Sequence, residues 1–194
     1  MSKVGVLAFQ GDVREHSAAL ERLGAAPVLV KTRDDLASVD ALIIPGGEST
    51  TIGKLLDRFD MIDPIADRAA SGFPIYGTCA GLILLAASVT GKHDAPHRLG
   101  LLDIEVARNG YGRQVDSFES ELEVKGLASS FRAVFIRAPI IESVGDAIEV
   151  LARCDGRPVL VRSANLMASS FHPEMTGDDR VHEMFLETIT GANA

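Results

Sequence analysis

The chain has 194 residues, of which 46% are hydrophobic and 24% charged, a composition typical of a folded globular protein rather than a disordered one. Its 19 Lys and Arg against 27 Asp and Glu give a net charge of −8 without the basic stripe that binding to a nucleic-acid backbone requires. The longest apolar stretch, 81–89, is far shorter than the ~20 residues of a membrane span, and 1–9 is too short for a signal-peptide core. We therefore expect a cytoplasmic protein with no nucleic-acid or membrane partner, folded as a single domain over 1–194.

The first half of the chain alternates strand-like and helical patterns. An apolar run at 4–9 ends in a glycine turn, and apolar residues then recur at helical spacing as far as Gly24. Three further apolar runs follow, at 28–30, 41–44 and 74–76, and a helical pattern at 62–70 precedes the last of them. Continuous apolar strands that alternate with helices indicate a parallel sheet covered on both faces.

The second half is richer in strands. Strand-like segments follow one another with little helical periodicity between them, at 101–106, 114–124, 133–137, 148–153 and 158–162. Asp155-Gly156 predicts a tight turn between the last two. A final strand at 166–171 precedes a helix that ends near Gly191. The predicted fold class is three-layer α/β, with a mostly parallel central sheet, helices on both faces, and an antiparallel strand region in the C-terminal half.

Cys79 lies where an apolar strand passes into a helical run at 82–87, in the sequence IYGTCAGL. Glycines stand two residues away on either side, which is the pattern of a nucleophile elbow with Cys in place of Ser. The sharp turn lifts the side chain out of the sheet, and the helix amides that follow favour the thiolate. The alternative is a buried core cysteine, as free cysteines often are. Because Cys154 lacks these features, we expect it to be structural.

His172 and Glu174 follow the last predicted strand in the sequence FHPE. Residues two apart on an extended segment point to the same side, and we expect Pro173 to keep the segment extended. Glu174 could then orient His172 as the base for Cys79. The alternative, a simple turn histidine, is weakened by the cysteine elbow. No histidine or cysteine spacing is typical of a zinc site, so we expect no metal.

The segment 45–50, PGGEST, directly follows the strand predicted at 41–44. Consecutive glycines at the carboxyl end of a strand let backbone amides turn into the crevice where open α/β sheets bind ligands. A Walker phosphate loop is excluded because Lys54 is followed by Leu55. We therefore predict an oxyanion hole in which the backbone amides of Gly47 and Ala80 bind a tetrahedral intermediate.

Taken together, these motifs resemble the class I, triad-type glutamine amidotransferases, and within them the glutaminase subunits of pyridoxal 5'-phosphate synthase, the PdxT type. The resemblance extends over the whole chain, through LAFQGDVREH, IIPGGEST, YGTCAGLILLA, VARNGYGRQ, VFIRAP and FHPEMTGDDRVHEMF. It implies hydrolysis of L-glutamine to L-glutamate and ammonia. Cys79 would be the nucleophile, His172 the general base and acid, and Glu174 the third member of the triad.

The resemblance also implies where glutamine binds. The matching positions are Gly47, Glu48, Ser49, Arg108, Ile136 and Arg137. An arginine can pair with the α-carboxylate through two hydrogen bonds. The sequence leaves open whether Arg108 or Arg137 does so.

A partner protein is implied in the same way. Proteins of this type pass ammonia to a separate (β/α)8-barrel synthase subunit, the PdxS type, within a large hetero-oligomer that builds pyridoxal 5'-phosphate. The phosphate ester is the product of that complex, so no cofactor is expected in this chain. The resemblance points to residues 10–16 and to the PGGEST loop as places where the partner could act.

Two alternatives remain open. A glutaminase subunit of another amidotransferase, in histidine or purine biosynthesis, would share the elbow and the His-x-Glu motif. A non-glutaminase relative, such as a peptidase, stress protein or sensor, could keep the cysteine elbow. Such relatives usually lack His-x-Glu after the last strand, and its presence at His172 and Glu174 argues against them.

Overall fold

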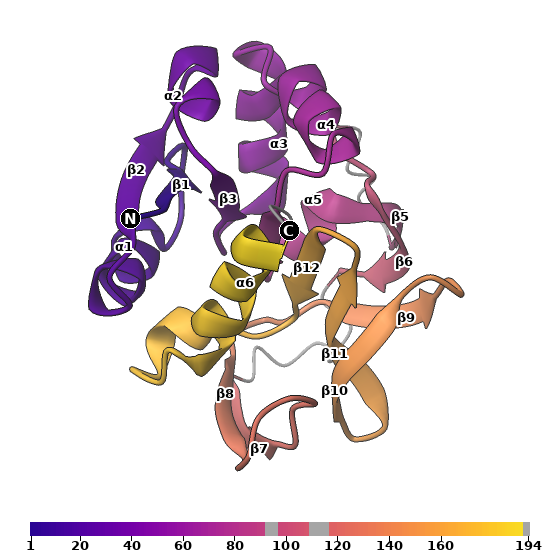
Figure 1. Ribbon diagram of the computed structural model, residues 1–194. Helices are drawn as coiled ribbons and strands as arrows, with labels where there is room; N and C mark the ends of the chain where they lie inside the picture. Colours follow the sequence, from indigo (N-terminus) through magenta and orange to yellow (C-terminus); the bar gives the residue numbers. More distant parts are fainter. Residues whose placement is uncertain (92–96, 109–116, 192–194) are drawn as a thin grey trace.

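The structure is a computed structural model that describes residues 1–91, 97–108 and 117–191. A seven-stranded sheet forms its centre, in the spatial order β10-β11-β12-β4-β3-β1-β2 (Figure 1). Five neighbouring strands, from β12 to β2, run parallel, while β11 is antiparallel to β12 and β10 is antiparallel to β11. The predicted fold class, mostly parallel with an antiparallel region in the C-terminal half, is confirmed.

The strands of the central sheet are short and largely buried. They are β1 (Lys3–Leu7), β2 (Ala26–Val30), β3 (Ala41–Ile44), β4 (Ile75–Thr78), β10 (Glu149–Cys154), β11 (Arg157–Ser163) and β12 (Leu166–Ser169). Two smaller sheets are formed by β5 (Ala86–Thr90) with β6 (Leu102–Ala107) and β9 (Ile140–Val144), and by β7 (Phe118–Leu122) with β8 (Phe131–Phe135).

The helices pack against the central sheet, and α1 to α4 lie between its parallel strands in the sequence. The helices are α1 (Val13–Arg22), α2 (Arg33–Ala37), α3 (Ser49–Arg58), α4 (Ile62–Ala70), α5 (Ala80–Leu85) and α6 (Arg180–Gly191), with a short 3-10 helix η1 (Pro173–Met175). None of the helices in the described ranges combines the length and apolarity needed to cross a bilayer.

Each face of the central sheet has its own hydrophobic core. Because side chains alternate along a strand, Leu42 and Ile44 of β3 pack into one core, while Ile43 packs into the other. The first core takes residues from α2, α3, α4 and α5, and the second from α1, α6, β7 and β8. The arrangement in Figure 1 agrees, with α6 on one side of the sheet and α3 and α4 on the other. Helices therefore cover both faces.

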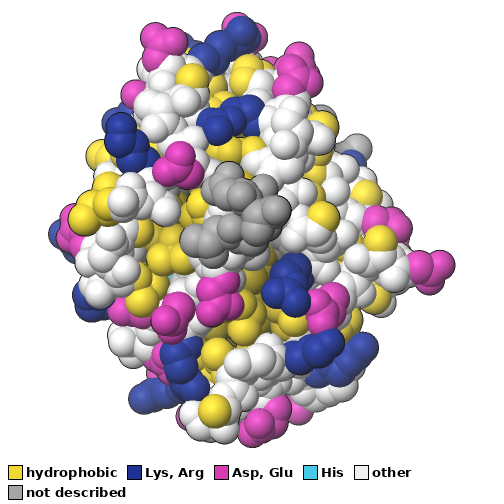
Figure 2. All heavy atoms as spheres, viewed as in Figure 1, with side chains coloured by type: hydrophobic (Ala, Val, Ile, Leu, Met, Phe, Trp, Pro, Cys, Tyr) yellow, Lys and Arg dark blue, Asp and Glu magenta, His cyan; other side chains and the backbone are white. Residues whose placement is uncertain are grey.

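The surface charge is mixed on the face that Figure 2 shows. Lys and Arg side chains are interspersed with Asp and Glu across its described part, so this face carries no continuous basic patch.

Some elements differ from the sequence prediction. The helix expected over 82–87 ends at Leu85, and Ala86 begins β5, because periodicity cannot divide one unbroken apolar run between helix and strand. The helices α2 and α3 and the strand β9 were not predicted. The short α2 is stabilised by a capping box between Thr32 and Asp35, a local signal that apolar periodicity does not detect. Part of the strand expected at 114–124 lies outside the described residues.

Gly81 sets the spacing between α5 and β3. A Cβ at this position would lie 2.1 Å from the carbonyl oxygen of Ile44, a backbone atom that cannot move aside. We expect Gly81→Ala to destabilise the fold by more than the ~1–3 kcal/mol typical of overpacking. Gly156→Ala is the matched control, because a Cβ there meets nothing and only the left-handed backbone, at φ 78°, opposes it. Denaturant unfolding of both variants measures the difference, and equal midpoints would contradict this reading of the α5–β3 contact.

Candidate active site

Four neighbouring parallel strands, β1, β3, β4 and β12, end at the same edge of the sheet, where open α/β folds bind ligands. Thr78 at the end of β4 pairs with Ser169 at the end of β12. The backbone amide of Cys79 donates to the carbonyl of Ser169 at 2.8 Å. This pairing places Cys79, which follows β4, beside His172, which follows β12.

Cys79 occupies the strained turn that the elbow pattern predicts. Its φ of 49° and ψ of −97° lie outside the regions that L-residues favour. A Cβ at Gly77 would lie 2.6 Å from the backbone of Gly81, so the flanking glycines are required by close backbone contact. The Cys79 side chain is largely buried, and Sγ lies 3.9 Å from the carbonyl oxygen of Ile136.

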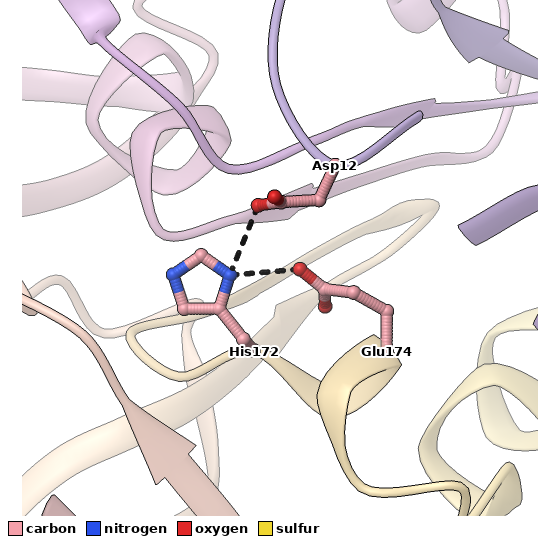
Figure 3. A group of neighbouring side chains, drawn as sticks. All are labelled: Asp12, His172 and Glu174. Atoms are coloured by element: carbon pink, nitrogen blue, oxygen red, sulfur yellow. Dashed lines mark hydrogen bonds and ion pairs between the residues drawn. The ribbon is translucent and has the colours of Figure 1, made fainter. Parts of the chain in front are cut away.

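His172 and Glu174 form a buried hydrogen-bonded pair, with Nδ1 of His172 2.8 Å from Oε1 of Glu174 (Figure 3). The backbone amide of His172 donates to Val134 of β8 at 2.8 Å, which fixes its main chain. The expected extended segment is wrong, because Pro173 begins the 3-10 helix η1. The fixed φ of proline suits the first position of a helical turn as well as it suits extended chain. The two side chains meet across this turn instead.

The environment of His172 favours its charged form. Burial lowers its pKa, but hydrogen bonds to Asp12, Cys79 and Glu174 together raise it to about 12. Burial raises the pKa of Glu174, and the hydrogen bond and charge of His172 oppose this effect. Because Nδ1 lies at hydrogen-bond distance from Oε1, we describe the pair as imidazolium and carboxylate.

A pocket of about 310 Å³ opens above this group, at the lower end of the ~300–1,000 Å³ range of small-molecule sites. Of the ten residues that the sequence singled out for catalysis or binding, nine line this pocket. The tenth, Glu174, contacts His172 from behind. The lining residues are Asp12, Gly47, Glu48, Ser49, Cys79, Ala80, Ile83, Arg108, Ile136, Arg137 and His172.

Glu48 and Arg108 form an ion pair in the pocket wall. Nη2 of Arg108 lies 3.1 Å from Oε1 of Glu48, which also caps α3 through the amides of Thr50 and Thr51. Partial burial raises the pKa of Glu48, but hydrogen bonds from Thr51 and Thr50 lower it below its usual value. Nη1 of Arg108 is buried without a hydrogen-bond partner among the described residues. Arg137 is exposed and has a φ of 46°.

Gly47 and Ala80 both line the pocket beside Cys79. Gly47 has a φ of 145°, and a Cβ there would lie 2.7 Å from Oε1 of Gln10. That same oxygen accepts the backbone amide of Glu48 at 2.8 Å, so Gln10 holds the PGGEST loop. Ala80 begins α5, where the first backbone amides have no partner within the helix.

Three residues near the site were not assigned to catalysis or glutamine binding from the sequence. Asp12 and Ile83 line the pocket, and the fully buried His16 has Nε2 3.5 Å from Oε2 of Glu174. The available signal for Asp12 and His16 was their position after the first strand, in GDVREH. Within the described ranges, Asp12, His172 and Glu174 also bring possible metal-ligating atoms within 4.8 Å of one another. Hydrogen bonds to Nδ1 account for this grouping, and a metal-free site stays a prediction.

The fold and the site, with a cysteine elbow beside a hydrogen-bonded His–Glu pair, define a class I glutamine amidotransferase. More particularly, the chain belongs to the SNO glutamine amidotransferase family, whose model matches residues 6–191. The pyridoxal 5'-phosphate synthase subunit PdxT of Frankia casuarinae is 52% identical over 193 residues, 99% of this chain and 97% of that protein. The subunit of the same name from Mycobacteroides abscessus is 51% identical over 186 residues, 96% of each chain. A crystal structure of a glutamine amidotransferase has 52% identity and a TM-score of 0.92, covering 96% of this chain and 98% of that one.

Proposed function

We propose that this chain is the glutaminase subunit of a pyridoxal 5'-phosphate synthase and that Cys79, His172 and Glu174 carry out the hydrolysis. The observation that carries the proposal is the pocket in which Cys79 and His172 meet at the ends of adjacent strands, with Glu174 hydrogen-bonded to His172. Full-length relatives that bear this subunit name support the assignment over another amidotransferase or a non-glutaminase relative.

The reaction begins with attack by the Cys79 thiolate on the side-chain amide carbon of L-glutamine. The oxyanion that forms is bound by the backbone amides of Gly47 and Ala80. His172 donates a proton to the leaving nitrogen, the C–N bond breaks, and ammonia departs. Water then gives a proton to His172 and attacks the glutamyl thioester. The C–S bond breaks to release L-glutamate and regenerate the thiolate.

Recognition of glutamine is assigned to Gly47, Glu48, Ser49, Arg108, Ile136 and Arg137. Of the two arginines, we assign the α-carboxylate to Arg108. Its Nη1 is a buried donor without a partner in the described ranges, whereas Arg137 is exposed. A buried unpaired donor is costly, so a ligand that satisfies it gains affinity.

We expect Arg108→Gln to raise KM for glutamine by roughly 10- to 100-fold, the usual value of a hydrogen bond to a charged group. The change in kcat should be smaller, because the reacting atoms lie at the other end of the substrate. Arg137→Gln is the matched comparison, since it removes the same charge from the same pocket. Steady-state kinetics on both variants measure the effect. A larger rise in KM for Arg137→Gln would reverse the assignment.

The ammonia goes to a synthase partner, which we propose to be a (β/α)8-barrel subunit of the PdxS type in a hetero-oligomer. The turn that carries Gln10 and Gly11 lies against the PGGEST loop, since a Cβ at Gly11 would be 1.7 Å from the carbonyl oxygen of Gly46. A partner that contacts this turn could therefore act on the peptide that carries the Gly47 amide.

We expect the isolated chain to be a poor glutaminase and the synthase subunit to stimulate it. The loss of one oxyanion donor costs on the order of 10²- to 10³-fold in turnover, so the orientation of a single peptide is enough to make activity depend on the partner. Glutamate release measured with and without the synthase tests this. Equal rates of glutamate release with and without saturating synthase would contradict the dependence of activity on the partner. The glutaminase assignment would be unaffected.

Two further expectations accompany this proposal. We infer that residues 1–194 form one domain, because the central sheet takes strands from both halves of the chain. The cytoplasmic location and the absence of a bound cofactor rest on the sequence and its resemblance.

A further inference from the structure

The residue directly before α1 carries a carboxylate that the mechanism above does not use. Asp12 is the N-cap residue of α1, where an Asp side chain ordinarily accepts a hydrogen bond from the first helical amides, yet it makes no such bond. Its Oδ2 instead lies 3.3 Å from Nδ1 of His172. Figure 3 shows Asp12 and Glu174 approaching the same ring nitrogen from different segments. His172 therefore has two carboxylate partners at one atom.

Backbone packing holds Asp12 in this position. A Cβ at Gly46 would lie 2.4 Å from Cε1 of His172 and 2.8 Å from Oδ2 of Asp12. The loop after β3 is thus closed over both side chains. The contact between Gly11 and the carbonyl of Gly46 packs the Asp12 turn against the same loop. These contacts hold the Asp12 carboxylate in a fixed position at the pocket wall.

One turn further along α1, His16 faces the other end of the same pair. Residues four apart lie on one face of a helix, and Nε2 of His16 is 3.5 Å from Oε2 of Glu174. Its Nδ1 lies 2.9 Å from Nε2 of His182, which ties α1 to α6. Burial lowers the pKa of His16 well below its usual value and that of His182 to about 4. Both rings are therefore neutral and anchor α1 without adding charge.

We propose that Asp12 is a positioning residue that shares the Nδ1 proton of His172 with Glu174, so that α1 and η1 together orient the imidazole toward Cys79. The proposal rests on the catalytic role proposed for His172. Without the Asp12 carboxylate, Glu174 alone would orient the His172 ring. The positive charge of the ring would then be balanced by one carboxylate instead of two.

The consequence for pH dependence follows from the groups around His172. Asp12 and His16 face it from α1, Glu174 from η1 and Cys79 from the elbow, while Glu48, Arg108 and Arg137 share the pocket. Among these the hydrogen bond to Asp12 raises the pKa of His172. An imidazolium with a raised pKa keeps its proton to higher pH. Loss of the Asp12 charge should therefore move the basic limb of the kcat/KM profile to lower pH.

The test compares Asp12→Asn with Glu21→Gln in the full chain, with the synthase subunit present. Glu21 is the matched control because it is an exposed carboxylate on the same helix and lies outside residues 10–16. We expect Asp12→Asn to lower kcat about 10-fold, the lower end for a hydrogen bond between charged groups. KM should change little, and the basic limb should move to lower pH. The control should retain the wild-type profile.

A double-mutant cycle with Glu174→Gln tests the sharing directly. Because either carboxylate can hold the Nδ1 proton when the other is removed, the double variant should lose more activity than the product of the two single losses. A simple product of the two losses would overturn the proposal. So would an unshifted pH profile in Asp12→Asn.

NMR titration of the His172 ring separates this inference from the proposed function, because it does not require turnover. We expect the midpoint of His172 to fall in Asp12→Asn and to stay unchanged in Glu21→Gln. A wild-type chain that releases no glutamate with the synthase present, yet shows this shift, would contradict the glutaminase role alone. An active wild type without the shift would contradict the role of Asp12 alone.

Discussion

Cys79→Ala should abolish glutamine hydrolysis and leave the fold intact. Cys79 supplies the thiol of this pocket, since the other cysteine, Cys154, lies on β10, in the antiparallel part of the sheet, with Sγ 3.7 Å from the hydroxyl of Ser120. Alanine is smaller than cysteine, and its Cβ occupies the position that the strained turn already accepts at φ 49°. Glutamate release measures the loss, and the unfolding transition checks the fold. We expect turnover to fall to the background of the assay.

Cys154→Ala is the control for this experiment. It removes the other cysteine of the chain, which is also buried, and should leave turnover nearly unchanged. Clear residual activity in Cys79→Ala, with the substitution verified by mass, would mean that another group attacks the amide.

His172→Asn should be the second most damaging substitution, with a loss of roughly 10²- to 10⁴-fold in kcat, the usual contribution of general acid–base transfer. Glu174→Gln should cost less, because it removes orientation and charge from the imidazole but leaves the proton carrier in place. Asp12 also remains 3.3 Å from Nδ1 when the Glu174 carboxylate is lost. Kinetics with the partner present give the order of the two losses, and the reverse order would exchange the two roles.

The three residues that we propose for catalysis could be singled out in the sequence because each lies in a local motif. The glycines on both sides of Cys79 indicate a sharp turn between a strand and a helix. His172 and Glu174 are only two residues apart, so their contact is also a local feature. Alternating apolar runs and helices likewise predicted the parallel sheet, and parallel strands bring their carboxyl ends together. These features depend on neighbours in the sequence, so one chain is enough to detect them.

The contacts of Asp12 and His16 could not be predicted in the same way. They depend on the spatial order β12-β4-β3-β1, which brings α1 from the beginning of the chain against η1 near its end. Nothing local distinguishes Asp12 from an ordinary N-cap residue. The conformation after His172 was missed for a different reason, because the φ of Pro173 permits both extended chain and a helical turn.

The choice between Arg108 and Arg137 also required the structure. Both are arginines in motifs of similar specificity, and only burial separates them. Arg108 is held by Glu48 with one buried nitrogen left unpaired among the described residues, while Arg137 is exposed at the pocket rim. Residue 108 is described, but the remainder of the RNGYGRQ motif lies outside the described ranges.

The central claim is that glutamine is bound in the pocket above Cys79 and attacked by its sulfur. Labelling with a glutamine analogue that carries an electrophilic carbon in place of the amide tests this claim most directly, with peptide mass analysis to locate the adduct. The account predicts one adduct per chain, on Cys79, whose formation is slowed by L-glutamine and abolished in Cys79→Ala. Modification of Cys154, or labelling at Cys79 that L-glutamine does not slow, would contradict it.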